Sequence, residues 1–485
     1  MVKRALVFVH RWLGVALCLL FLVWFLSGIG MMYFPMPEVT DADRLDRAPP
    51  LDASAIRMSP SEAAAALAVD VTQLRLTNFA GRPAYRTAAT RAARGRVLYA
   101  DTGEPQGPIS RTMADAIAAR WIGQPASAAR VEEVLEPDQW TLQVPLAALG
   151  PVMKYAWPNG EQVYVSQASG DVVQYTTASS RLGAYLGPIP HWFYVTPLRS
   201  RSPLWNRVVV WTSGLGTIAA ALGVLVGVWM YSPSKAYRHR GLPTSIPYVG
   251  QKRWHIILGL AIGVPAITYA FSGMLSMEPF PSWEDRRPST DALERALAGR
   301  VESAAFDHRP PAEALAQLGD RRARQLEFLF FRGHAFHLAR VEGGNTWLVP
   351  AKGNPVDTFD PSEIARAVTA STNGQLAARV LNQYDRYYLD RHGRLPLPVV
   401  LAEAADGSGL RYYIDPATAR IVRIFDPANW KTRWLYHGLH SLDLPWLYAY
   451  RPLWDLIVLA LMLGGGALSV TSIVLATRVV RRRQS

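Results

Sequence analysis

Residues 10–35 read HRWLGVALCLLFLVWFLSGIGMMYFP, and residues 255–280 read HIILGLAIGVPAITYAFSGMLSMEPF. Both stretches open on a histidine and continue as a long apolar run. Aligned at an offset of 245 residues, they share identical residues in register: His10 and His255, Leu13 and Leu258, Gly14 and Gly259, Ala16 and Ala261, Ser27 and Ser272, Gly28 and Gly273, and Met32 and Met277. This repeat predicts that the chain arose by tandem duplication.

A second histidine recurs near the end of each half. His191 lies twelve residues before Pro203-Leu204-Trp205, and His440 lies twelve residues before Pro452-Leu453-Trp454. Each half therefore has the same order: a histidine, an apolar helix, a long polar segment, a second histidine and a second apolar helix.

The composition indicates a membrane protein. Half of the 485 residues are hydrophobic and 18% are charged, whereas about a quarter are charged in a typical soluble protein. A bilayer is crossed by about twenty mainly apolar residues, and four stretches are long enough: 5–33, 204–231, 254–277 and 453–477. We expect these helices to contact membrane lipid. The single cysteine, Cys18, lies in the first span, so neither a disulfide nor a c-type haem attachment pair is expected.

The net charge of +13 is concentrated in three short segments. Three basic residues lie at the start of the chain, five lie in the loop 232–253 and four lie in the tail 478–485, with no acidic residue among them. The remaining basic residues, 39 of 51, nearly balance the 38 acidic ones. By the positive-inside rule, both termini and the loop are cytoplasmic, and no nucleic-acid partner is needed to explain the charge. The long segments 36–201 and 278–451 are then expected in the periplasm of a bacterium, beyond its inner membrane.

Each long segment is expected to fold as an α+β domain. In the first, Ser59-Pro60-Ser61-Glu62 is a capping box that predicts the start of a helix, and β-rich runs follow, one of them from Trp140 to Val144. In the second, Pro311-Ala312-Glu313-Ala314 repeats the helix start. His334 and His337 are three residues apart on an expected strand, so they point to opposite faces and do not chelate a metal together. The catalytic residues are unknown at this stage.

A helix opened by Pro-x-Glu-Ala and followed by strands ending in Asp-Pro or Asp-Thr-Gly turns resembles the PepSY module. With four spans, the sequence His10-Arg11-Trp12-Leu13-Gly14 and the step Leu439-His440-Ser441, the whole chain resembles the PepSY-associated transmembrane family. A glycine often follows the His-Ser step in that family, whereas Leu442 stands here. The resemblance implies a bacterial inner-membrane protein linked to iron uptake; some members are haem-containing reductases of ferric siderophores.

The recurring histidines have two interpretations. One is that a histidine suits a membrane interface, where its ring is apolar and one edge stays wet. The other, which rests mostly on the family resemblance, is that they are axial ligands of haem b, since neutral imidazole is a common axial ligand and polar groups at membrane depth are functional candidates. His10 would then pair with His255 near the cytoplasmic face, and His191 with His440 near the outer face, giving two haems.

Three further residues are linked to this hypothesis. His437 lies three residues before His440 and would share its helix face, which makes it the reserve ligand. Gly14 and Gly259 each follow a repeated histidine by four residues; they either admit a flat macrocycle or allow close helix packing.

The sequence supports two functional hypotheses of different classes. In the first, the protein is an inner-membrane di-haem electron carrier that reduces a periplasmic ferric chelate during iron uptake. Its electrons come from a partner protein or a membrane quinol, because the cytoplasmic parts are too short for a flavin or nicotinamide domain. In the second, the protein is a non-enzymatic membrane anchor whose PepSY units bind or regulate a periplasmic peptidase or another partner.

Overall fold

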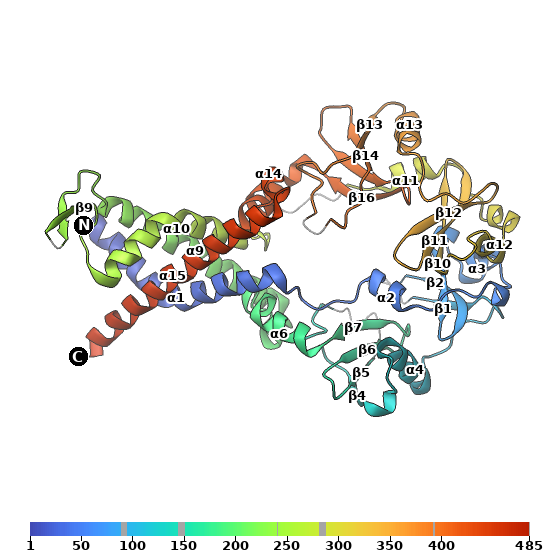
Figure 1. Ribbon diagram of the computed structural model, residues 1–485, viewed down its shortest axis with the longest axis horizontal. Coiled ribbons are helices and arrows are strands. Elements are labelled where there is room, and N and C mark those ends of the chain that lie inside the picture. The colour runs from blue at the N-terminus through green and yellow to red at the C-terminus, as the bar shows by residue number, and fades with distance from the viewer. Residues whose placement is uncertain (89–94, 144–150, 240, 281–287, 391–392, 485) are drawn as a thin grey trace. The chain divides into compact units, whose positions relative to one another are not determined.

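The computed structural model describes residues 1–88, 95–143, 151–239, 241–280, 288–390 and 393–481, together with the backbone of residues 482–484. The chain divides into two compact units (Figure 1). The helical unit comprises Met1–Met36, Ser179–Arg286 and Ala428–Ser485, and the sheet unit comprises Pro37–Ala178 and Arg287–Pro427. Each unit therefore contains segments from both halves of the sequence.

Long helices form the core of the helical unit. Within the described residues, four are long and apolar enough to cross a membrane: α1 (Val2–Tyr33), α9 (Ser202–Met230), α10 (Gly250–Leu275) and α15 (Arg451–Gln484). α1 and α10 each pack against both α9 and α15, so α1 and α10 occupy opposite corners of a four-helix bundle. The chain is a membrane protein with apolar helices where the composition predicts them.

Proline sets several features of these helices. α1 ends at Tyr33, and the next residue, Phe34, has an extended backbone immediately before Pro35. α9 has Pro203 in its first turn, where a backbone N–H has no partner within the helix. Pro265 lies inside α10. The helix boundaries therefore follow from residues that are visible in the sequence.

Short elements connect the long helices. They are α6 (Ala178–Leu186), α7 (Pro188–His191), α8 (Thr196–Arg199), the hairpin of β8 (Tyr237–His239) and β9 (Leu242–Thr244), a π-helix (Thr432–Gly438) and α14 (Pro445–Tyr448). α7 ends on His191, and the π-helix directly precedes His440. These two short helices therefore position the second histidine of each half.

The sheet unit is organised around one antiparallel sheet. Over the described ranges the sheet has six strands, in the order β12 (Thr346–Pro350), β11 (His334–Val341), β10 (Ala323–Phe331), β1 (Leu74–Phe79), β2 (Arg82–Thr87) and β3 (Val97–Tyr99). In the central pair, Leu76 on β1 lies opposite Leu326 on β10. The sheet thus takes three strands from each long segment.

This sheet corrects the expectation that segments 36–201 and 278–451 form two separate α+β domains. A three-stranded sheet from either segment alone would leave the edge of β1 or β10 without hydrogen-bond partners, and pairing the two edges satisfies their backbone groups. The core follows the same pairing, because Leu76 shares one cluster of buried side chains with Leu326 and Phe328. The α+β class is confirmed, but the domain boundary does not follow the sequence halves.

Two smaller antiparallel sheets and several helices complete the sheet unit. In the described chain, the smaller sheets consist of β4 (Arg130–Val134), β5 (Val152–Ala156), β6 (Gln162–Ser166) and β7 (Val172–Thr176), and of β13 (Leu376–Leu381), β14 (Val399–Ala404), β15 (Arg411–Asp415) and β16 (Arg420–Phe425). The helices are α2 (Asp41–Arg47), α3 (Pro60–Leu67), α4 (Arg111–Ile122), α11 (Asp291–Ala298), α12 (Pro311–Ala316) and α13 (Pro361–Ser371). Both segments therefore run in the same order of helices and strands.

Hydrogen bonds from side chains to the backbone explain why the helix predicted at Ser59 is present and why the strand predicted from Trp140 is not. The capping box at Ser59 is present, with the Glu62 carboxylate accepting the Ser59 N–H at 2.8 Å. The strand expected from Trp140 is wrong, because residues 140–143 form turns; Val144 lies outside the described residues. The carboxylate of Asp138 accepts the backbone N–H groups of Trp140 and Thr141 at 3.0 and 3.1 Å. An aspartate bonded to the backbone in this way favours a turn over a strand.

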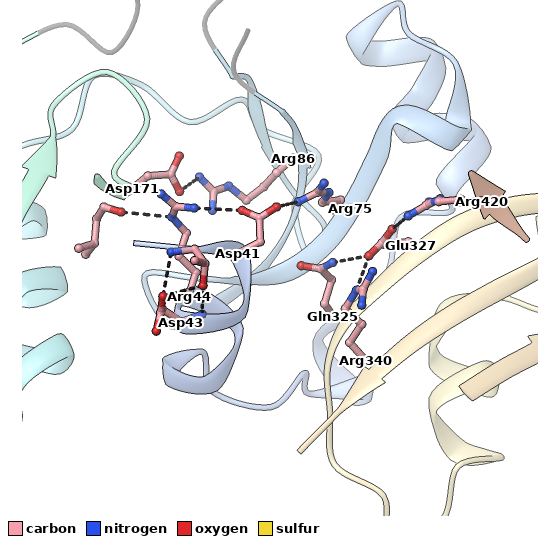
Figure 2. Close-up of polar contacts among 12 residues, drawn as sticks. Asp41, Asp43, Arg44, Arg75, Arg86, Asp171, Gln325, Glu327, Arg340 and Arg420 are labelled. Carbon is pink, nitrogen blue, oxygen red and sulfur yellow. Dashed lines mark hydrogen bonds and ion pairs between the residues drawn. The ribbon is translucent and has the colours of Figure 1, made fainter. Parts of the chain in front are cut away.

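A buried glutamate ties β10 to two other strands. Glu327 on β10 is 2% exposed. Its carboxylate accepts hydrogen bonds from Nε of Arg340 on β11, at 2.6 Å, and from the guanidinium of Arg420 on β16 (Figure 2). Burial raises the pKa of the carboxyl, but the two guanidinium groups outweigh burial and lower the pKa to about 2. Glu327 is therefore ionised and paired at neutral pH.

Replacing this glutamate tests the role of the pair. Because the pKa of Glu327 falls from an ordinary 4.5 to about 2 on folding, its contribution to stability is complete above pH 4.5 and is lost as the pH falls towards 2. We expect Glu327→Gln to lower the free energy of unfolding by about 2 kcal/mol at neutral pH and to weaken its dependence on acid. Thermal unfolding of the detergent-purified chain between neutral pH and pH 3 measures both effects.

Glu363→Gln is the matched control. It breaks an exposed ion pair with Arg332, 2.8 Å long, and we expect a loss below about 0.5 kcal/mol. Equal losses in the two variants would contradict the role assigned to Glu327.

Candidate functional site

His10 and His255 form the first histidine pair, inside the four-helix bundle. His10 lies in α1 and His255 in α10, and their ring centres are 6.2 Å apart. Nδ1 of His10 lies 3.0 Å from the carbonyl oxygen of Ala219 on α9. Nδ1 of His255 lies 3.1 Å from Oγ1 of Thr471 on α15. All four long helices therefore contribute to this pair.

His191 and His440 form the second histidine pair. Their ring centres are 6.0 Å apart. Nδ1 of His191 lies 3.1 Å from Oγ of Ser27 on α1, and Nδ1 of His440 lies 3.0 Å from Oγ of Ser272 on α10. Because the two serines are related by the offset of 245 residues, both halves of the chain make the same contact.

The loops after these two histidines are also alike. Phe193 and Leu442, each two residues after a histidine, have left-handed backbones with φ of 53° and 51°. The indole N–H groups of Trp205 and Trp454 each donate to the carbonyl of the residue that follows the histidine, at 2.7 and 2.9 Å. Each loop is therefore held by the tryptophan of its Pro-Leu-Trp sequence.

The backbone at Leu442 gives a physical reason for the glycine that is common at this step. Glycine adopts a positive φ freely, whereas the left-handed conformation costs another residue roughly 1 kcal/mol. The Leu442 side chain packs against the buried cluster that contains Trp454 and Val458, and this apolar contact offsets the strain. The chain thus keeps the turn with a different residue.

The hydrogen-bond partners determine which nitrogen of each ring carries the proton. The carbonyl oxygen of Ala219 can only accept, so His10 donates from Nδ1. The hydroxyls of Ser27, Ser272 and Thr471 each donate to a carbonyl of their own helix, so each oxygen accepts Nδ1–H from its histidine. Among the described residues, none hydrogen-bonds to Nε2 of these histidines. All four rings therefore keep an unprotonated Nε2.

Glycines keep side chains away from the rings. A Cβ atom at Gly28 or at Gly273 would lie 3.6 Å from Cε1 of the adjacent histidine of the second pair. A Cβ atom at Gly223 on α9 would lie 2.7 Å from Cε1 of His10, closer than real side chains approach. Because these three positions are glycines, no side chain from them contacts the neighbouring histidine ring.

The two pairs lie at different heights in the bundle. His10 is near the start of α1, and Ser27, which contacts the second pair, follows 17 residues later on the same helix. At 1.5 Å per residue, this spacing is roughly 25 Å along the helix axis. α10 repeats the arrangement with His255 and Ser272.

The structure also places the other residues that the sequence singled out. The ring centre of His437, the reserve ligand, lies 4.9 Å from that of Tyr436, and its Nδ1 lies 3.8 Å from Asp443. A Cβ atom at Gly14 would meet nothing within 4 Å, so this glycine does not serve close helix packing. At Gly259 the nearest atom would be a side-chain carbon at 3.9 Å.

His334 and His337 point to opposite faces of β11, as predicted. His334 is exposed, whereas His337 is fully buried and donates Nε2–H to the carbonyl of Arg309 at 2.8 Å. Over the described residues, no group of three or more histidine, cysteine, aspartate or glutamate side chains is arranged to hold a metal ion.

Comparison with known proteins extends the resemblance over almost the whole chain. The family model described as the PepSY-associated TM region matches residues 7–478, a range that includes both histidine pairs. The chain belongs to this family. Among curated proteins, none matches the sequence.

In this PepSY-associated membrane protein, the sequence pointed to the histidine pairs but not to their hydrogen-bond partners. Ser27 and Ser272 were visible as a repeated pair, and their position within two turns of the end of an apolar helix was the available signal. Ala219 acts through its backbone carbonyl, which leaves no mark on the residue type. Thr471 is not one of the residues repeated between the two halves, so the repeat does not identify it.

Gly30 allows the backbone of α1 to lie close to the backbone at Gly187, in the segment that carries His191. This close contact leads to a testable prediction. A Cβ atom at Gly30 would lie 2.8 Å from Cα of Gly187, which is backbone and cannot rotate away. Gly30→Ala must therefore push the two segments apart, and we expect a loss of about 1–3 kcal/mol, seen as a lower thermal unfolding temperature in detergent.

Gly14→Ala in the same helix is the control. Nothing lies within 4 Å of its added methyl group, so the unfolding temperature should stay the same or rise slightly, since alanine favours a helix. A similar decrease in both variants would show that the close approach at Gly30 is not the cause.

Proposed function

We propose that the protein is an inner-membrane di-haem electron-transfer protein that reduces a periplasmic ferric chelate, such as siderophore-bound iron, during iron uptake. One observation carries the proposal: four histidines lie in two facing pairs, each Nδ1 lies within hydrogen-bond distance of an oxygen, and no described residue bonds to Nε2. Metal-binding histidines characteristically donate their second ring N–H to a carbonyl or another acceptor, which fixes the tautomer. Histidines that only lay at a membrane interface would not need to face a second histidine with ring centres about 6 Å apart.

The residues fit haem in type and spacing. Two imidazole nitrogens that each lie about 2 Å from one iron put their ring centres about 6 Å apart. The ring centres are 6.2 Å apart in the first pair and 6.0 Å apart in the second. The sequence has one cysteine, Cys18, inside α1, so the fitting group is haem b, held without thioether bonds. His10 and His255 would hold one haem, and His191 and His440 the other.

Haem supplies one-electron transfer through its iron when it is bound. The four histidines would hold the haem through their ring nitrogens, while the neighbouring helices orient the rings and keep them inside the bundle. The carbonyl of Ala219 and the hydroxyls of Ser27, Ser272 and Thr471 set the tautomer of each ring. The spacing of roughly 25 Å along α1 is close to the hydrocarbon thickness of a bilayer, about 30 Å. Sites with this spacing suit electron transfer across a membrane.

The proposed reaction needs a donor and an acceptor outside this chain. One electron reduces Fe(III) in the chelate to Fe(II), which the chelator holds less tightly. A partner protein or a membrane quinol supplies that electron. The basic termini and the basic loop 232–253 support a cytoplasmic location for these parts, which puts the sheet unit in the periplasm. We attribute the matching contacts of the two halves to a tandem duplication.

Absorption spectroscopy of histidine variants tests the proposal. We expect the detergent-purified protein from haem-replete cells to show sharp b-type bands in a reduced-minus-oxidised spectrum. Alanine at any one of His10, His255, His191 or His440 should remove about half of the haem, because each haem loses an axial ligand. The double variant of His10 and His191 should remove both haems, and reduction of a ferric siderophore should fall with the haem content.

His334→Ala is the matched control, since this histidine is exposed on the sheet unit. It should retain both haems, and His437→Ala should do the same. A colourless wild-type protein would refute electron transfer and favour a membrane-anchored binding protein.

The serine contacts give a second test of the site. Ser272→Ala removes the acceptor of Nδ1–H but leaves His440 in place, so we expect haem at this pair to be held about tenfold more weakly, as for other supporting contacts to metal ligands. Haem retention during dilution and gel filtration measures this change. Ser276→Ala, which alters an exposed hydroxyl near the end of the same helix, should retain haem as the wild type does; equal loss in both variants would contradict the contact.

A further inference from the structure

The sheet unit contains a recess that electron transfer does not use. Its volume is about 580 Å³, and its walls come from both long segments: the chain around Arg47, the β1–β2 turn and Arg120 from the first, and Arg322, Arg324 and Glu342 from the second. Sites that hold small molecules commonly have volumes of about 300–1,000 Å³. We call this feature the arginine recess.

Arg324 is the fixed member of the arginine recess. Its side chain is 14% exposed, and it forms an ion pair with Glu342 at 2.7 Å. The same guanidinium donates to the backbone carbonyls of Leu45 and Asp46, so it joins the two segments that form the walls. Because Arg324 neutralises Glu342, this acidic side chain does not balance the other arginines.

Arg47 forms no ion pair with a carboxylate in the described part of the chain, although the carboxylate of Asp43 is close enough to interact with its charge. Its guanidinium lies over the rings of Trp121, at 4.6 Å, and Tyr175, at 5.4 Å, and it donates to the backbone carbonyl of Asp43 at 3.4 Å. A stacked guanidinium keeps its plane fixed and its N–H edge available for hydrogen bonds. Arg47 is thus preorganised to bind an acceptor.

Arg120 and Arg322 are exposed and form no ion pair with any residue in the described part of the chain. Arg120 lies in the last turn of α4, and its Nη2 would be 4.0 Å from a Cβ atom at Gly81, whose φ is +94°. The turn at Gly81 therefore carries no side chain between Arg120 and the arginine recess.

The arginine recess differs from other charged sites of the sheet unit because several arginines gather there. Arg75 pairs with Asp41 at 3.1 Å, and Arg86 pairs with Asp171 at 2.7 Å (Figure 2). In the arginine recess, by contrast, three unpaired guanidinium groups face one unneutralised carboxylate, that of Asp46. The recess has an excess of positive charge within a chain whose remaining charges nearly balance.

We propose that the arginine recess binds a small molecule that carries two or more carboxylate or phosphate groups. A planar guanidinium offers a fork of N–H donors that matches both kinds of oxyanion. Arg47, Arg120 and Arg322 approach from different elements, so a ligand with several oxyanions engages them together. The site is independent of the histidine pairs.

Isothermal titration of the detergent-purified full-length protein, at constant ionic strength, tests the proposal with citrate and with pyrophosphate as probes. We expect one of them to bind once per chain, and Arg120→Gln and Arg322→Gln each to weaken it about tenfold, since each removes a charge-assisted hydrogen bond. Tighter binding of citrate assigns the recess to carboxylates, and tighter binding of pyrophosphate assigns it to phosphates.

Arg366→Gln is the matched control, because Arg366 is an exposed arginine of α13 that does not line the recess. It should leave binding unchanged, and all variants should keep the wild-type unfolding temperature. The proposal is overturned if neither probe binds at about 10 mM, or if the recess variants bind as tightly as the control.

Discussion

A neutral histidine ring inside a membrane protein has one N–H that needs an acceptor, and the helical unit places an oxygen beside Nδ1 of four such rings. Each Nδ1–H finds an oxygen on a neighbouring helix, so each ring is oriented by a helix other than its own. In α1 and α10 the acceptor serine is followed directly by a glycine, Gly28 or Gly273. The serine contacts Nδ1 of the ring, and the glycine packs beside the ring without a side chain. Both halves of the chain place these two adjacent residues against the second histidine pair.

The sheet unit shows a different use of polar groups. Its buried carboxylate, Glu327, is matched by two arginines from separate strands, and this matching fixes how β10, β11 and β16 lie together. The arginines of the recess are instead left without carboxylates. The three arginines Arg47, Arg120 and Arg322 line one recess together, so their charges are concentrated at a single place on the sheet unit.

The sequence predicted the features that depend on residue patterns recognisable along the chain. Apolar length identified the spans, and a four-residue capping box identified the start of α3. The offset of 245 residues identified His10 and His255, and the spacing of twelve residues from Pro-Leu-Trp identified His191 and His440. The features it missed depend on residues far apart in the chain. The pairing of β1 with β10 is decided by two strand edges in different segments, and Ala219 contributes a carbonyl that every residue type possesses. The failure at Trp140 has a local cause, since Asp138 competes for backbone groups that a strand would need.

The shared sheet has a consequence for how the protein is made. β1 cannot complete its hydrogen bonds until β10 has been synthesised, and the two strands are separated in the chain by both α9 and α10. At ribosomal rates of about 5–20 residues per second, the edge of β1 waits on the order of ten to fifty seconds for its partner. An unpaired strand edge is a site of aggregation during this interval. The time at which β10 leaves the ribosome, after both middle helices, therefore sets how long the edge of β1 stays exposed.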